Sequence, residues 1–261
     1  MLDISLLDRR YQITCERPEL ETTLATLTSG FHQNPTRPVD VEADITADLQ
    51  IRGLGPQTRC ESTEQLAIGF EHALLHDALV ASSCLPLHAA VVGIHDRITM
   101  LVGQSGVGKT TVTLGLLGRG CSFLSDEAAP IDPETGHVHP FPRCPAASQE
   151  TMRLLNVDPE ALRHIVLAGV FCISPESFSS VADSPHPVDD VVFMTRGETS
   201  HITPLTGQEG MTRLIQAASG ESDRTQAFDT VGRIAKRAQF SEMTNGRLED
   251  SLDILWGAID R

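Results

Sequence analysis

A glycine-rich loop, followed by a pair of acids, holds the residues of this chain best suited to chemistry. The run GQSGVGKT at 103–110 fits the pattern G-x-x-x-x-G-K-[ST], with an apolar run before it and a helical pattern after it. Glycines let backbone N–H groups close around a phosphate, the lysine reaches the β- and γ-phosphates, and the threonine hydroxyl can bind Mg²⁺. The pattern predicts a nucleotide-phosphate site rather than a glycine-rich turn that binds nothing. We expect the site to be lined by Gly103, Gln104, Ser105, Gly106, Val107, Gly108, Lys109, Thr110 and Thr111.

Two adjacent carboxylates, Asp126 and Glu127, follow the next short apolar run. A strand-borne acid beside a phosphate loop commonly holds the metal, and a second acid can serve as a base toward an incoming hydroxyl. We therefore expect Thr110, Asp126 and Glu127 to bind the metal, with the division of roles between the two acids left open. The alternative is a solvated pair at the start of a loop.

His88 precedes the two apolar runs that lead into the loop. If those runs pair as strands, His88 lies near the mouth of the loop, where it could orient an acid or contact a transferred phosphoryl group. A lone histidine at the end of a strand is more often structural, so the residues alone leave its role undecided.

The elements that must position these side chains can be read from the pattern around the loop. The apolar runs 89–94 and 97–102 are separated by His95-Asp96, which predicts a tight hairpin and hence an antiparallel neighbour for the strand entering the loop. A doubly wound nucleotide fold would place a βαβ crossover there instead. Residues 109–119 suit a helix that ends at Gly120, and the run CSFL then predicts a buried strand ending at the acid pair.

The rest of the chain predicts a mixture of helices and strands. Helices are expected over 62–82, 149–164, 207–218 with a Thr206/Glu209 capping box, 222–237 and 247–259. Strands are expected as a half-buried pair over 39–51, on both sides of a turn at 132–136, and in the runs IVLAGVFCI, DDVVFMT and AQFSEMT.

Composition excludes several classes of protein. The chain has 261 residues and a formal net charge of −15, so neither nucleic acid nor an anionic membrane is expected as a partner. The sequence contains no C-x-x-C pair of the kind that indicates a zinc site. It also contains no apolar run long enough to cross a membrane. The start, MLDISLLDRRYQ, lacks the basic and apolar regions of a signal peptide, so we expect a cytoplasmic protein.

The motifs LHAAVVG, GQSGVGKTTVTLGLLGRG and FLSDE, at these spacings, resemble the HPr kinase/phosphorylase family. They resemble most closely its shorter bacterial relatives, which include kinases of lasso-peptide and other ribosomal-peptide gene clusters. The resemblance is sharp over about 85–145, loose over 165–260 and nearly absent over 1–60. It implies an α/β fold with a phosphate-loop core and mixed sheet, akin to phosphoenolpyruvate carboxykinase. In that core the helix after the loop returns at once to a strand bearing an acid pair.

The resemblance also implies a division of the chain and roles for its residues. A small α+β region would span 1–82, and the catalytic domain 83–261. The family's catalytic histidine falls on His88, its loop lysine on Lys109 and its metal-binding hydroxyl on Thr110. Its paired aspartates fall on Asp126 and Glu127, so the second acid is a glutamate here.

Two departures separate this chain from true HPr kinases. The glutamate–arginine–glycine-rich signature expected after the acid pair is missing from 128–200, and the N-terminal region is shorter than theirs. Both argue against HPr as the substrate and against phosphorolysis.

The predicted activity is an ATP- and Mg²⁺-dependent kinase acting on a serine hydroxyl of a small protein or precursor peptide. Alternatives are an HPr(Ser) kinase/phosphorylase, a small-molecule kinase, or a nucleotide-binding regulator with weak ATPase activity. Arg143 and Arg196 are candidates for holding the acceptor or the transferred phosphate, since arginine suits bidentate phosphate contacts, although a surface ion pair is equally expected of each. The family likeness also implies a homo-oligomer.

Overall fold

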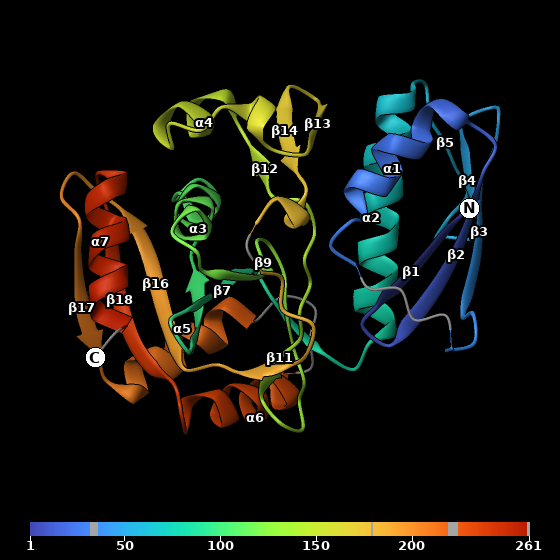
Figure 1. Ribbon diagram of the computed structural model, residues 1–261. Coiled ribbons are helices and arrows are strands. Elements are labelled where there is room, and N and C mark those ends of the chain that lie inside the picture. Colours follow the sequence, from blue (N-terminus) through green and yellow to red (C-terminus); the bar gives the residue numbers. More distant parts are fainter. Residues whose placement is uncertain (32–35, 179, 219–223, 260–261) are drawn as a thin grey trace. The chain divides into compact units, whose positions relative to one another are not determined.

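The structure is a computed structural model that describes residues 1–31, 36–178, 180–218 and 224–259. It divides into two compact units (Figure 1). Unit 1 comprises residues 1–83, 143–149 and 158–177, and unit 2 comprises 84–142, 150–157 and 178–261. Two short segments from the second half of the chain thus belong to unit 1.

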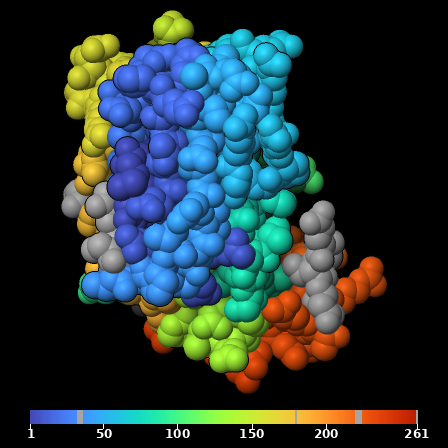
Figure 2. All heavy atoms as spheres, turned by 90° about the vertical axis from the view of Figure 1, so that its right-hand side faces the viewer, coloured from blue at the N-terminus to red at the C-terminus, as the bar shows by residue number. Residues whose placement is uncertain are grey.

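Unit 1 contains a five-stranded sheet in which the strand order follows the chain. Its strands are β1 (Leu2–Leu6), β2 (Arg9–Cys15), β3 (Val41–Ile45), β4 (Gln50–Arg52) and β5 (Thr58–Arg59), all antiparallel except the parallel pair β2–β3. Apolar and polar residues alternate, so the buried residues Ile4, Tyr11, Ile13 and Ile45 share one face. Blue atoms from the N-terminal part of the chain occupy much of the upper part of the face shown in Figure 2. The expected strand pair over 39–51 is confirmed by β3 and β4.

The long helix of unit 1 is α2 (Thr63–Ala81), and the shorter α1 (Glu21–Leu27) precedes it. Ser62 caps α2, because its hydroxyl accepts a hydrogen bond from the Gln65 N–H at 3.1 Å. Leu66, Phe70 and Leu74 recur at helical spacing and are buried. The predicted helix over 62–82 is confirmed.

Two sequence predictions fail between residues 149 and 173. A helix was expected over 149–164, but α4 (Gln149–Leu154) is short, since Asn156 has φ +52° and Pro159 disfavours a helical conformation before it. One strand was expected over 165–173, but β13 (His164–Leu167) and β14 (Val170–Ile173) form a hairpin. Ala168 and Gly169 both have positive φ, as a tight two-residue turn requires. β12 (Ala146–Ala147) pairs with β14 to complete this sheet.

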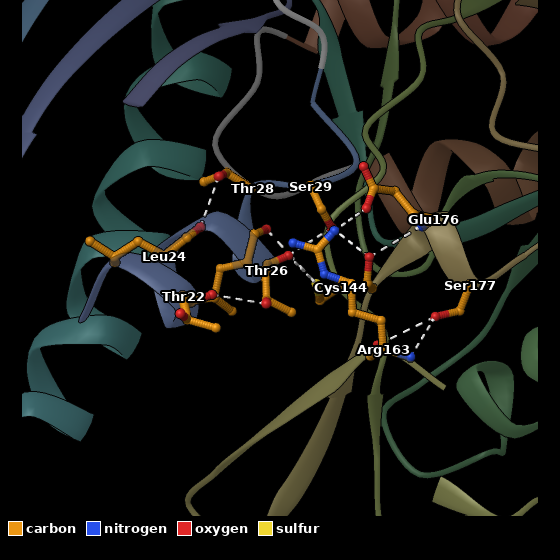
Figure 3. Close-up of polar contacts among 11 residues, drawn as sticks. Thr22, Leu24, Thr26, Thr28, Ser29, Cys144, Arg163, Glu176 and Ser177 are labelled. Atoms are coloured by element: carbon orange, nitrogen blue, oxygen red, sulfur yellow. Dashed lines mark hydrogen bonds and ion pairs between the residues drawn. The ribbon is translucent and has the colours of Figure 1, made fainter. Parts of the chain in front are cut away.

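Polar contacts join α1 to the segment around Cys144 within unit 1 (Figure 3). The Thr26 and Thr28 hydroxyls donate back to the carbonyls of Thr22 and Leu24, at 2.9 and 2.8 Å. The Cys144 thiol donates to the Thr26 carbonyl at 3.2 Å. The Leu24 and Thr26 carbonyls also accept from the backbone N–H groups of Thr28 and Ser29, so the side-chain bonds add a second donor at the end of α1.

Unit 2 is built on a six-stranded mixed sheet with the order β17-β18-β16-β8-β7-β9. Its strands are β7 (Ala89–Ile94), β8 (Arg97–Val102), β9 (Ser122–Ser125), β16 (Asp190–Arg196), β17 (His201–Leu205) and β18 (Gln239–Asn245). β8, β16 and β18 run parallel, while β7 is antiparallel to both of its neighbours, β8 and β9. The predicted hairpin over 89–102 is confirmed, with His95 at φ +53° in its turn.

Helices cover both faces of this sheet (Figure 1). α3 (Lys109–Gly118) and α7 (Leu248–Ile259) pack together on one face, where a Cβ on Gly115 would lie 2.7 Å from a methyl of Leu252. α5 (Gly207–Ala218) and α6 (Arg224–Ala235) contribute to the core on the other face. A small sheet joins this core and contains β6 (Leu85–Leu87), β10 (Ala129–Ile131), β11 (His137–Val138) and β15 (His186–Pro187).

Most of the expected elements of unit 2 are present. The Thr206/Glu209 capping box starts α5, with the Glu209 carboxylate accepting from the Thr206 N–H at 2.9 Å and Glu209 N–H donating to the Thr206 hydroxyl at 3.3 Å. The helix expected over 222–237 corresponds to α6, and residues 222–223 lie outside the described part of the chain. Across the described ranges, no helix is both long enough and apolar enough to cross a membrane.

Two helical glycines of unit 2 should respond in opposite directions to alanine. A Cβ on Gly210 in α5 would lie 2.1 Å from the Phe240 ring, whereas one on Gly257 in α7 would have no neighbour within 4 Å. We expect Gly210→Ala to destabilise by about 1–3 kcal/mol through overpacking. Gly257→Ala should be neutral or stabilise by up to about 1 kcal/mol through helix propensity. Urea unfolding of both variants checks this, and equal effects would contradict the packing of α5 on β18.

Candidate functional site

Three strand termini of unit 2 meet at one edge of the six-stranded sheet. β8 and β9 are both antiparallel to β7, which lies between them, so their carboxyl ends point to the same edge. The glycine loop follows β8 and the acid pair follows β9. β7 starts at that edge, because Ala89 is the register partner of Val102, and His88 directly precedes it. The topology therefore brings together the loop, the acids and the histidine.

The glycine loop has a backbone that its glycines make possible. Gly106 and Gly108 have φ values of +84° and +95°. A Cβ on Gly103 would lie 2.8 Å from the Met194 carbonyl oxygen, closer than real Cβ contacts, so only glycine fits where the loop passes β16. Gly108 is the N-cap of α3, which places the N-terminus of that helix directly after the loop. Such an arrangement can bind a phosphate.

Lys109 is folded back over the loop rather than extended into water. Its residue is 7% exposed, and its ammonium donates to the carbonyls of Gly103 at 2.7 Å and Gln104 at 3.3 Å. Burial lowers the pKa of Lys109 below its ordinary value, while the charge of Asp126 acts in the opposite direction. The result is a cation held at the place where phosphate charge would be bound.

His88 completes the coordination of that ammonium. Its Nε2 lies 3.1 Å from the Lys109 Nζ, and an ammonium can only donate, so Nε2 accepts and the ring proton resides on Nδ1. Partial burial of the ring and the positive charge of Lys109 lower the pKa of His88, which keeps the ring neutral. From sequence, His88 was expected either to orient an acid or to contact a phosphoryl group, and both remain predictions. The contact that the structure shows is with the loop lysine, which His88 orients.

The two acids have different environments. The Thr110 hydroxyl donates to Oδ2 of Asp126 at 3.1 Å, and Asp126 is buried. Glu127 is exposed. The Ser125 hydroxyl donates to the Ala128 carbonyl across the turn that carries both acids, which fixes the turn after β9. One acid thus faces the loop threonine, and its neighbour is accessible to a substrate.

The oxygen atoms of Thr110 and Asp126 fit a magnesium ion that arrives with a nucleotide. Mg²⁺ is usually held by one or two carboxylates together with substrate phosphates and water, rather than by a cage made of protein alone. Within the described ranges, no group of three or more His, Cys, Asp or Glu residues could hold a metal by itself. The residues therefore suit a metal shared with phosphate and do not form an independent metal site.

The two candidate arginines lie in different units. Arg143 belongs to unit 1, where its Nη2 lies 3.2 Å from Oε2 of Glu71 and both side chains are largely buried. Arg196 ends β16 in unit 2 and is exposed, at the sheet edge that carries the glycine loop. Arg143 is engaged in an ion pair, whereas Arg196 remains available at the candidate site.

Asn245 is a site residue that the sequence analysis did not identify. Its side-chain amide donates to the Val107 carbonyl of the glycine loop at 2.8 Å, from the end of β18. An Asn-Gly dipeptide is by itself only a turn signal. The contact could not be read from sequence, because it depends on the pairing of β18 with β16 and of β16 with β8. Thr111 also has a partner in unit 2, since its hydroxyl lies 3.3 Å from that of Thr151 in α4.

Comparison with known proteins adds little to this geometry. No protein-family model matches the chain. No curated protein matches its sequence. Among solved structures, the chain is similar to the Hpr(Ser) kinase/phosphatase from Coxiella burnetii, with a TM-score of 0.35 and 12% identity over 67% of this chain and 95% of that one. Similarity at that level carries no argument about function.

The ionisation of Lys109 provides a direct test of the site. The chain has two lysines, Lys109 and Lys236, so isotope-labelled lysine side chains give two NMR signals that Lys236→Arg assigns. We expect the Lys109 amine to titrate below its ordinary pKa because it is buried, and Asp126→Asn to lower that pKa further by removing the opposing charge. A Lys109 amine that titrates at or above the ordinary value would contradict the buried position.

The Arg143–Glu71 pair should matter for stability rather than for the site. Burial raises the pKa of Glu71 and Arg143 opposes this, so the folded state binds the proton more tightly than the unfolded state. The free energy of unfolding therefore falls as pH rises from the ordinary pKa of a glutamate to the raised pKa of Glu71. Arg143→Met raises the pKa of Glu71 further and so widens this pH range. We expect Arg143→Met to cost about 3–5 kcal/mol at neutral pH and less in acid.

Chemical unfolding at pH 5 and pH 8 measures this difference. The matched control is Arg163→Met, which removes an arginine whose ion pair with Glu176 is exposed. That loss should be within about 1 kcal/mol at both pH values. Equal losses for the two variants would show that the Arg143–Glu71 pair is not buried.

Proposed function

We propose that this protein is an ATP- and Mg²⁺-dependent kinase that transfers the γ-phosphoryl group to a serine hydroxyl of a small protein or precursor peptide. The observation that carries the proposal is the 3.1 Å contact between the Thr110 hydroxyl and the buried Asp126, beside a glycine loop whose lysine is held over it. A hydroxyl and a carboxylate at that position are what a nucleotide-bound Mg²⁺ requires.

The binding residues act by position and charge. The loop N–H groups and the N-terminus of α3 would bind the phosphates, and Lys109 would add a positive charge against them. His88, neutral and accepting from Lys109, keeps that ammonium at the loop. Thr110 and Asp126 would hold the magnesium ion, which supplies neutralisation of phosphate charge when bound. Positioning and electrostatics provide most of the acceleration in phosphoryl transfer.

Burial separates the roles of the two acids. Asp126 faces Thr110 and has little access to solvent, which suits a metal ligand. Glu127 is exposed at the same turn, which suits a base that accepts the proton of an incoming hydroxyl. We therefore assign the metal role to Asp126 and the base role to Glu127.

The nature of the acceptor rests on the motif resemblance and on Arg196. The resemblance implies a serine in a small protein or peptide, and assembly into a homo-oligomer. Arg196, exposed at the same sheet edge as the loop, is our candidate for holding the acceptor or the transferred phosphate. A planar guanidinium can make two hydrogen bonds to a phosphate or carboxylate.

Radiolabelled ATP separates this proposal from its alternatives. Transfer of label to serine-containing peptides, lost in Lys109→Met, supports a peptide kinase. Transfer only to small hydroxyl compounds would indicate a small-molecule kinase on the same core. Slow release of phosphate that no acceptor accelerates would indicate a nucleotide-binding regulator.

The division of roles between the acids gives distinct kinetics. We expect Glu127→Gln to lower kcat by about 10²-fold or more, with the Mg²⁺ dependence unchanged, because a base contributes that much to proton transfer. Asp126→Asn should shift the Mg²⁺ requirement to higher concentration as well as slow transfer. The measurement is the initial rate over a magnesium titration for each variant. Identical magnesium curves for the two variants would refute the division.

A further inference from the structure

A hydrogen-bonded chain of side chains reaches the glycine loop from β18 and α7. Asn245 donates from Nδ2 to the Val107 carbonyl at 2.8 Å, and its Oδ1 accepts from the Ser251 hydroxyl at 2.8 Å. The Val107 carbonyl can only accept, so the amide nitrogen faces the loop and the amide oxygen faces Ser251. Ser251 is fully buried in α7 and its hydroxyl lies 2.9 Å from that of Ser200, in the segment before β17.

Ser200 closes the chain onto the turn that carries Asn245. Its hydroxyl accepts from the Gly246 N–H at 3.1 Å, and its single proton can be donated either to the Ser251 hydroxyl or to the Arg247 carbonyl, which lies 3.1 Å away. Asn245 is therefore restrained through its own side chain and through the backbone that follows it. Its amide reaches the loop already oriented, which reduces the entropy that the contact would otherwise cost.

The absence of a side chain at Gly108 leaves room for the Asn245 amide. A Cβ on Gly108 would lie 2.5 Å from Nδ2 of Asn245, so no other residue could occupy that position while the contact is kept. Gly108 also has φ +95°, where a side chain would be strained. The glycine of the loop pattern thus serves the approach of Asn245 as well as the backbone conformation.

The contact has a direct consequence for phosphate binding. In a trans peptide group the C=O and the following N–H point in opposite directions, and the group is planar. The Val107 carbonyl points toward Asn245, so the Gly108 N–H points away from Asn245. Without the amide, that peptide group would lose the bond that holds it in this orientation.

We propose that Asn245 is a positioning residue that aims the Gly108 N–H at the bound phosphate. It acts through the Val107–Gly108 peptide group and touches no reacting atom, with Ser251 and Ser200 holding its amide in place. This inference rests on the proposed function, because it assumes that the loop binds a nucleotide phosphate.

The experiment measures ADP and ATP affinity by calorimetry, at a temperature where every variant is fully folded, together with the melting temperature. Asn245→Ala should weaken the affinity for both nucleotides by about tenfold or more. The loss of one hydrogen bond that orients a phosphate-binding peptide group corresponds to a change in affinity of about that size. Ser251→Ala keeps the Asn245 amide but removes the bond that orients it. We expect it to weaken binding by a smaller factor, about threefold.

Asn156→Ala is the matched control. Asn156 is also in unit 2 and exposed, and its φ of +52° favours asparagine over alanine. This control should lower the melting temperature and leave nucleotide affinity unchanged. A stability loss in Asn245→Ala with affinity equal to that of the control would overturn the proposal.

Two further outcomes separate this inference from the proposed function. If the wild-type chain binds neither nucleotide, the proposed function fails, and the inference fails with it. If the wild type binds nucleotide and Lys109→Met abolishes binding, but Asn245→Ala binds within twofold of the wild type, the inference alone is wrong. Should Asn245→Ala not fold, a threefold loss in Ser251→Ala supports the proposal and an unchanged affinity refutes it.

Discussion

The placement of β7 between β8 and β9 is the constraint on which the candidate site depends. A hairpin with a turn at His95 makes β7 antiparallel to β8, and pairing with β9 reverses direction again. β8 and β9 consequently end at the same edge, so one helix between them is enough to bring Asp126 to Thr110. A βαβ unit with β9 directly beside β8 would give the same polarity but would not start a third strand, with His88 before it, at the loop.

A second constraint is electrostatic. The chain carries a formal net charge of −15, yet the proposed function requires its site to attract phosphate. The fold meets this requirement locally, with the ammonium of Lys109 held by two carbonyls and the neutral His88, and with the N-terminus of α3 beside it. In the described part of the chain, the hydrogen-bond acceptors of Lys109 are uncharged, so the positive charge of Lys109 remains effective toward a ligand.

Local patterns predicted the parts of the structure that depend on neighbouring residues. The hairpin before the loop, α2 with its Ser62 cap and the Thr206/Glu209 box could all be read from sequence, because each is fixed by residues a few positions apart. The Ala168-Gly169 turn was missed because these two residues lie inside a continuous apolar run, which predicted a single strand. Arg143 could not be paired with Glu71, nor Asn245 with Val107, since both contacts depend on how distant segments pack.

Asn245 also connects Arg196, the proposed acceptor-binding residue, with the glycine loop. It pairs with Arg196 in the parallel ladder of β16 and β18, and its carbonyl accepts from the Gly197 N–H at 3.2 Å. The backbone carbonyl of Asn245 therefore holds the turn after Arg196, and the side chain of Asn245 holds the Val107 carbonyl. A displacement of either strand end would be transmitted to the loop through two hydrogen bonds of a single residue. For the transfer reaction proposed above, which depends on alignment of two substrates, this shared anchor would limit how far the two proposed binding regions can move apart.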